Sequence, residues 1–231
     1  MGKNYGILVD VERCLGCGVC VTVCKQENGL PPHIDDVPGT TGTSWNQVLA
    51  ISEGKYPNFW EYHFPVHCMH CQNPPCVPSC PQEAIKKNDN GIVLISENRC
   101  NGCEDETDKL RKCVSACPYG AIQFNLEKGV AQACTFCAHR VGAGVEPACV
   151  RACIGRCMTF GDFSDPDSGI SKEAAAAGDR LFVLGEEKDT RPSLKYINPS
   201  RPQNVRVDKI SPLARVTAVY GYNSNYNKPT E

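Results

Sequence analysis

The cysteines of this 231-residue chain follow a repeated spacing that limits its fold more than any other feature. Two cysteines with two residues between them are followed, after a gap of two to eleven residues, by a third cysteine, and after three more residues by a fourth. This quartet occurs four times and takes in sixteen of the seventeen cysteines. The quartets are Cys14, Cys17, Cys20 and Cys24; Cys68, Cys71, Cys76 and Cys80; Cys100, Cys103, Cys113 and Cys117; and Cys134, Cys137, Cys149 and Cys153.

Iron–sulfur clusters explain this spacing better than disulfides or zinc do. A disulfide framework is typical of secreted proteins, but residues 1–10 lack the apolar stretch of a signal peptide. Zinc prefers two separated Cys-x2-Cys pairs around one tetrahedral ion, whereas the compact Cys14–Cys20 triplet resembles the ligand run of bacterial ferredoxins. Because every quartet is complete, we expect four [4Fe–4S] clusters with the sixteen cysteines as iron ligands.

The ligands of each cluster are predicted from the reach of the cysteines. A loop that holds three cysteines closes around its own cluster, and the next cysteine points past it to a second cluster, so two motifs exchange their fourth ligands. The second and third motifs are neighbours in the sequence, which leaves the first and fourth to pair around them. The predicted sets are Cys68, Cys71 and Cys76 with Cys117; Cys100, Cys103 and Cys113 with Cys80; Cys14, Cys17 and Cys20 with Cys153; and Cys134, Cys137 and Cys149 with Cys24.

The pattern of strands, cluster loops and short helices predicts an α+β fold of two ferredoxin-like [4Fe–4S] modules, the inner one inserted in the outer one. Residues 1–66 and 126–170 form the predicted outer module, residues 67–125 the inner module, and residues 171–231 a short helix followed by a long extended tail that binds a partner.

Individual elements are predicted from local signals. Strands are expected at 5–10 and 60–66, and a hairpin over 84–96 with Asn90-Gly91 as its turn. Residues 30–58 are rich in Gly, Pro, Thr and Ser and are expected to form a surface excursion. A helix is expected to begin at an N-cap at Ser171 and to end at Gly178.

Composition excludes two classes of partner. The formal charge of −2 falls to about −10 when four clusters with about −2 each are added, and no basic run is present, so nucleic acid is not expected to bind. No apolar stretch approaches the ~20 residues that cross a bilayer, so no direct membrane span is expected.

Cys157 and three histidines lie outside this scheme. Cys157 follows the last quartet by four residues and is interpreted as a small buried apolar residue, with a substitute ligand as the alternative. His67, His70 and His139 lie next to cluster cysteines. Since all four quartets are complete, we interpret these histidines as neighbours of the ligands and not as ligands.

Four further stretches resemble a known family. The chain is similar to the four-cluster electron-transfer subunit of molybdopterin oxidoreductases of the dimethyl sulfoxide reductase family, which includes polysulfide, thiosulfate and arsenate reductases. Residues 42–46 and 54–57 also resemble the transhydroxylase small subunit. Ile154 stands where the family has proline, and the third motif contains an acidic insert at 104–112. The stretches that carry the resemblance are YGILVDVERC (5–14), CQNPPCVPSCP (71–81), CTFCAHR (134–140) and FGDFSDPDS (160–168).

The resemblance implies a relay of electrons and no catalysis by this chain. Four [4Fe–4S] clusters would pass electrons to or from a large catalytic subunit with a molybdenum or tungsten bis-pterin cofactor, often joined by a membrane quinone-reactive subunit. The expected location is the outer face of the cytoplasmic membrane, reached through a partner's export signal, with the cytoplasm as the alternative. A free-standing polyferredoxin and a multi-zinc interaction module are the rival interpretations.

Overall fold

The computed structural model describes residues 2–30, 44–103, 111–125 and 128–200. The strands are β1 (Tyr5–Asp10), β2 (Asn46–Lys55), β3 (Asn58–His67), β4 (Ile85–Lys87), β5 (Val93–Ile95), β6 (Gln123–Asn125), β7 (Val130–Gln132), β8 (Met158–Asp162), β9 (Leu181–Phe182) and β10 (Leu194–Ile197). The α-helices are α1 (Val19–Glu27), α2 (Cys76–Ser79), α3 (Lys112–Ala116), α4 (Ala138–Gly142), α5 (Ala148–Arg151) and α6 (Gly169–Ala177), and short 3-10 turns occupy Val11–Arg13, Gly178–Arg180 and Glu186–Lys188. Helices and strands together confirm the predicted α+β class.

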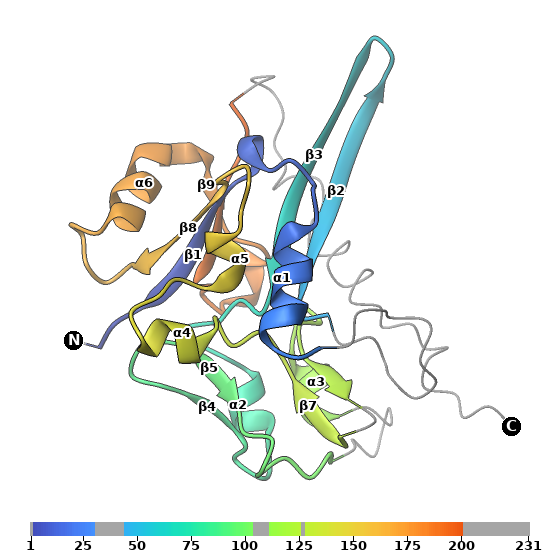
Figure 1. Cartoon of the computed structure of the whole chain (residues 1–231), viewed down its shortest axis with the longest axis vertical. Helices are drawn as coiled ribbons and strands as arrows, with labels where there is room; N and C mark the ends of the chain where they lie inside the picture. The colour runs from blue at the N-terminus through green and yellow to red at the C-terminus, as the bar shows by residue number, and fades with distance from the viewer. Residues whose placement is uncertain (1, 31–43, 104–110, 126–127, 201–231) are drawn as a thin grey trace, which may run out of the picture.

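A four-stranded sheet in the order β8-β1-β10-β9 lies in one half of the molecule (Figure 1). The strand β1 pairs antiparallel with β8 and parallel with β10. Its predicted bounds, residues 5–10, are confirmed. Ile7, Leu8 and Val9 are almost completely buried, because both faces of this strand are covered. The helix α6 packs on one face through Ile170 and the small side chains beside it.

The sequence interpretation of the last described segment was wrong. Residues 192–200 were expected to belong to an extended tail, but Leu194–Ile197 form the strand β10 inside the sheet. Leu194 and Tyr196 are fully buried, and the Tyr196 hydroxyl donates a hydrogen bond to the carbonyl oxygen of Pro65, 3.1 Å away. The strand is short and its parallel partner lies at the other end of the chain, so no local pattern marked it. Residues 201–231 lie outside the described part of the chain.

The strands β2 and β3 form a ribbon that projects from the body of the molecule (Figure 1). They pair antiparallel over their whole length, from Asn46 opposite His67 to Lys55 opposite Asn58. The expected surface excursion at 30–58 is therefore wrong for residues 46–55, which form a regular strand, while 31–43 lie outside the described residues. Leu49, Ile51 and Phe64 are buried where the ribbon joins the body of the molecule, whereas Tyr56 at its tip is exposed.

The other half of the molecule holds the hairpins β4–β5 and β6–β7 with α2 and α3 (Figure 1). Their own small core includes Ile85, Val93 and Ile122. The hairpin predicted over 84–96 is confirmed by the pairing of β4 with β5. The hairpin β6–β7 runs across residue 126, where the inner module was expected to end, and Ala131 belongs to the same small core. Residues 130–133 therefore pack with the half of the molecule that holds β4 and β5.

Two details of local structure complete the fold. The helix α6 begins three residues earlier than expected, because the Ser168 side chain caps it by accepting a hydrogen bond from the backbone N–H of Ser171. Its predicted end at Gly178 is confirmed. Within the described residues, no helix has the length and apolar character that crossing a bilayer requires.

Candidate iron–sulfur cluster sites

The first motif occupies a turn that only glycines can make, followed by a helix. Gly16 and Gly18 have φ values of +66° and +70°, and a Cβ on Gly16 would come within 2.7 Å of the His63 ring. The turn leads into α1, which carries Cys20 and Cys24 one helical turn apart, and both are buried. The backbone therefore delivers two thiols on one helix face.

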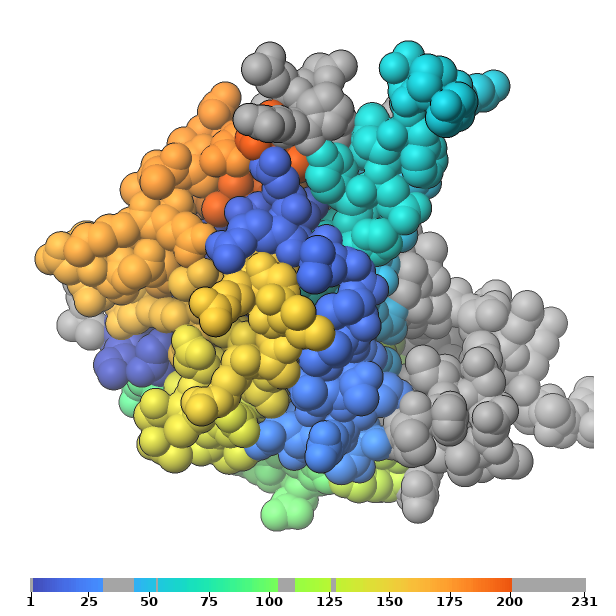
Figure 2. All heavy atoms as spheres, turned by 45° about the horizontal axis from the view of Figure 1, so that its top comes forward, coloured from blue at the N-terminus to red at the C-terminus, as the bar shows by residue number. Residues whose placement is uncertain are grey.

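The two cysteines of α1 face different groups of thiols. Burial raises the pKa of Cys20 to about 12. The thiols of Cys14, Cys153 and Cys17 lie near enough to raise it further when they are ionised. Burial also raises the pKa of Cys24 to about 12, and among the other thiols Cys137 of the fourth motif contributes most to the rise. The helix packs against α5, so the first motif lies against the fourth, and Figure 2 shows these blue and yellow segments side by side.

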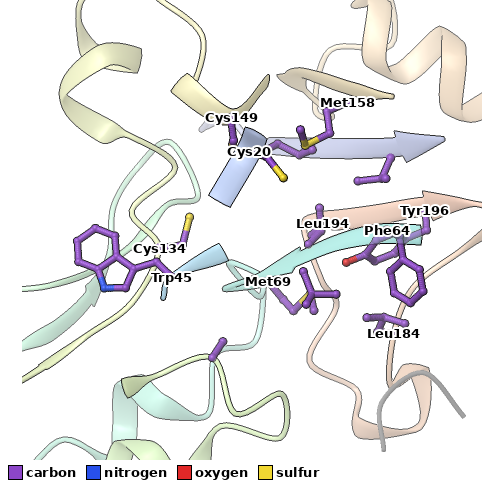
Figure 3. Packing of buried hydrophobic residues seen from close by; sticks show 14 of the residues in the cluster. Cys20, Trp45, Phe64, Met69, Cys134, Cys149, Met158, Leu184, Leu194 and Tyr196 are labelled. Atoms are coloured by element: carbon purple, nitrogen blue, oxygen red, sulfur yellow. The ribbon is translucent and has the colours of Figure 1, made fainter. Parts of the chain in front are cut away.

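One pocket lies between α1 and the fourth motif. Four cysteines line it, and these are the four that the sequence assigned to one cluster: Cys24, Cys134, Cys137 and Cys149. Asn28 Nδ2 donates to Cys24 Sγ at 3.7 Å, and the backbone N–H of Phe136 donates to Cys134 Sγ at 3.4 Å. Trp45 also lines this pocket, and Figure 3 shows its ring beside Cys134, with Cys20 and Cys149 nearby.

A second pocket lies in the other half of the molecule. Its walls include four cysteines from two motifs, Cys80, Cys100, Cys103 and Cys113. Two backbone N–H groups point at its sulfurs: Ala84 donates to Cys80 at 3.3 Å and Ala131 to Cys100 at 3.4 Å. Burial raises the pKa of Cys113 to about 12, and the charges of the other three thiols add to this.

The remaining eight cysteines gather in two further groups. Burial raises the pKa of Cys68, and the nearby thiols of Cys117, Cys76 and Cys71 raise it further when they are ionised. Burial raises the pKa of Cys117, and the nearby backbone N–H groups of residues 119–122 act in the opposite direction. The other group surrounds Cys20, as described above. All sixteen sequence-predicted ligands lie in the described part of the chain.

These four groups fit the cofactor that the cysteine spacing implies. Thiolate sulfurs are the ligands of [4Fe–4S] clusters. Two of the groups each line a pocket with four cysteines, and in the other two the four thiols affect one another's pKa values. Burial raises the pKa of buried members such as Cys20, Cys24 and Cys113 to about 12, so these thiols must release protons to become ligands. Among the described residues, no three Cys, His, Asp or Glu side chains are placed to hold a single metal ion.

Cys157 is buried beside two predicted ligands. Its Sγ lies 3.4 Å from Cys153 Sγ, and its backbone N–H donates to the same sulfur at 3.3 Å. The proximity of Cys157 also lowers the pKa of Cys14, and the same contact raises the pKa of Cys157. The interpretation as a buried residue is confirmed, with 4% of its surface exposed.

The three histidines differ from one another. His67 and His70 are fully buried and pack on the ring of Phe136. Burial lowers the pKa of His67 to about 4; its Nδ1–H donates to the Cys68 carbonyl oxygen at 2.9 Å. His70 Nδ1 accepts a hydrogen bond from the backbone N–H of Val93 at 3.0 Å, so its proton lies on Nε2. His139 is at the surface and contacts Glu27 at 2.7 Å.

Sequence reasoning missed Thr190. Its hydroxyl shares a hydrogen bond with the Tyr119 hydroxyl, and its proximity to Cys71 acts to lower the pKa of that thiol. The backbone around it holds the second motif: the N–H groups of Gln72 and Asn73 donate to the carbonyl oxygens of Arg191 and Thr190 at 2.9 and 3.0 Å. A threonine far from any cysteine motif carries no local signal, so only the folded chain reveals this contact.

Several known proteins are similar to this chain over most of its length. A family model described as a 4Fe-4S dicluster domain matches residues 59–163. The iron–sulfur subunit of a putative dimethyl sulfoxide reductase from Halobacterium salinarum is 37% identical, over 86% of this chain and 82% of the relative. The B subunit of tetrathionate reductase from Salmonella typhimurium is 39% identical, over 84% and 72%. The B subunit of sulfite dehydrogenase from Allochromatium vinosum is 36% identical, over 89% and 87%.

Proposed function

This chain belongs to the family of iron–sulfur subunits of dimethyl sulfoxide reductase-type oxidoreductases, and we propose that it relays electrons to or from a catalytic subunit with a molybdenum or tungsten bis-pterin cofactor. Bound [4Fe–4S] clusters would supply one-electron redox chemistry. The chain's own residues hold the clusters, exclude water and direct N–H groups at sulfur, and such contacts tune cluster potentials. Substrate chemistry belongs to the partner.

The proposal includes four clusters with exchanged ligands. The observation that carries it is the pair of pockets, each lined by four cysteines that come from two separate motifs. In one, Cys24 of the first motif joins three cysteines of the fourth; in the other, Cys80 of the second motif joins three of the third. The charged neighbours of Cys20 and Cys68 support the same exchange in the two remaining groups. The inner module is then inserted in the outer one.

The electrostatic influence of thiols in one group on the pKa values of thiols in the next supports an order for the relay. Cys149 has Cys20 among its charged neighbours, which links the group of Cys14 to the group of Cys134. Cys134 in turn neighbours Cys68, and Cys76 neighbours Cys113. We propose a linear order from the cluster of Cys14, Cys17, Cys20 and Cys153, through that of Cys24, Cys134, Cys137 and Cys149, then that of Cys68, Cys71, Cys76 and Cys117, to that of Cys80, Cys100, Cys103 and Cys113.

A docked subunit is favoured over a free polyferredoxin, because the similar proteins are named as subunits of reductases and a dehydrogenase. A multi-zinc module would contain no reducible centre. The membrane quinone-reactive partner and the location outside the cytoplasmic membrane remain predictions.

Purification of the native complex tests the partnership. We expect the tagged chain, isolated anaerobically from its source organism, to bring down one large subunit with molybdenum or tungsten in about a one-to-one ratio to the chain. The clusters of this complex should be oxidised by the catalytic subunit's substrate, or reduced by it, while those of the isolated chain should not respond. The proposal fails if the chain elutes alone, reducible and without either metal.

A further inference from the structure

Cys157 is the one cysteine that the four quartets do not use, yet its position is fixed as firmly as theirs. It precedes β8, and its carbonyl oxygen accepts a hydrogen bond of 2.8 Å from the backbone N–H of Asp10 at the end of β1. Only 4% of its surface is exposed. The thiol cannot turn to solvent, so its neighbours decide what it does.

Those neighbours are two cysteines from opposite ends of the chain's cluster region. Cys153 Sγ lies 3.4 Å from Cys157 Sγ and also accepts the backbone N–H of Cys157 at 3.3 Å. The proximity of Cys157 lowers the pKa of the Cys14 thiol. Both neighbours belong to the same predicted ligand set, together with Cys17 and Cys20. Whichever sulfur accepts the Cys157 proton, the hydrogen bond reaches the same cluster.

Chemistry decides which partner donates. The ligands Cys14 and Cys153 must be thiolates, which accept hydrogen bonds and cannot donate them. A third thiolate beside them would add another buried negative charge next to two thiolates, which is costly. Cys157 therefore keeps its proton, and its S–H is the donor.

We propose that Cys157 is a positioning residue whose S–H donates a hydrogen bond to the Cys153 thiolate and raises the reduction potential of the cluster that Cys153 holds. The inference rests on the proposed function, because it requires a cluster in this group. Reduction adds negative charge that spreads onto the ligand sulfurs. A donor stabilises the more negative, reduced state more strongly, and hydrogen bonds to sulfur are one way proteins set cluster potentials.

Two substitutions separate the hydrogen bond from packing. In the complex, Cys157→Ala should lower the midpoint potential of one cluster by about 59 mV, the equivalent of a tenfold change in a one-electron equilibrium. Cys157→Ser retains a donor and should keep the potential at or above that of the unmodified protein. Ile170→Val removes one carbon from the core beneath α6, away from the cysteines, and should shift no potential. Redox titration followed by electron paramagnetic resonance reads all clusters separately.

Three results would overturn the inference. Cys157→Ala could leave every potential unchanged, or Cys157→Ser could lower the potential as far as Ala does. Cys157→Ala could also convert the cluster to a [3Fe–4S] form, which would make Cys157 a ligand. If the alanine variant does not assemble, a potential of the serine variant below the unmodified value still contradicts the inference. Absence of reducible clusters from the unmodified protein would instead refute the proposed function.

Discussion

A chain that ends after Asp189 is expected to lose its fold and its clusters, whereas a chain that ends after Ser200 is expected to keep both. The first truncation removes β10 from the interior of the sheet and leaves β1 without its parallel partner. It also removes the buried side chains of Leu194 and Tyr196. Losing a large buried side chain costs about 2–5 kcal/mol, and total stabilities are about 5–15 kcal/mol, so the remaining chain should not fold.

The same truncation removes support from a cluster site. Thr190 contacts Cys71, and Ser193 N–H donates to the Met69 carbonyl oxygen at 2.9 Å in the second motif. Iron content per chain and elution volume measure the outcome. The truncation after Ser200 is the matched control, because it keeps every described contact of β10. Equal iron contents in both truncated proteins would contradict the place given to β10.

Serine substitutions at three cysteines are expected to alter two different clusters. Cys20→Ser and Cys153→Ser should change one and the same paramagnetic signal, and Cys24→Ser should change another. The structure gives the reason: Cys20 has Cys153 among its charged neighbours, while Cys24 lines a pocket with cysteines of the fourth motif. Each substitution should convert its cluster to a [3Fe–4S] form or shift its potential, because serine can still bind iron.

The control for these variants is Cys157→Ser, which changes a cysteine in the same region that is not a predicted ligand and should convert no cluster. Redox titration with electron paramagnetic resonance identifies the altered signal in each case. If Cys20→Ser and Cys24→Ser change one and the same cluster, each motif binds a cluster alone. The exchange of ligands and the nested modules would then be wrong.

Local sequence signals predicted the elements that local interactions decide. The strand β1 has the predicted bounds, and the hairpin β4–β5 lies where Asn90-Gly91 indicated a turn. The cysteine spacing also predicted which motifs lie side by side, since α1 of the first motif packs against α5 of the fourth and α2 of the second against α3 of the third. The spacing thus carried information about contacts between distant motifs.

The elements that were missed depend on distant partners. Residues 46–55 follow a stretch rich in Gly, Pro and Thr, and become a strand through pairing with β3. Leu194–Ile197 form a strand only because β1 lies beside them. The contact of Thr190 with Cys71 depends on the same docking of the chain's end. Tertiary packing determines these elements, and local sequence patterns do not predict such packing.

Iron and acid-labile sulfide in the anaerobically purified chain, measured together with zinc, test the central claim most directly. Four [4Fe–4S] clusters predict about sixteen iron and about sixteen sulfide per chain, in a brown protein that bleaches on reduction. A colourless protein with zinc in molar excess over iron would contradict the account.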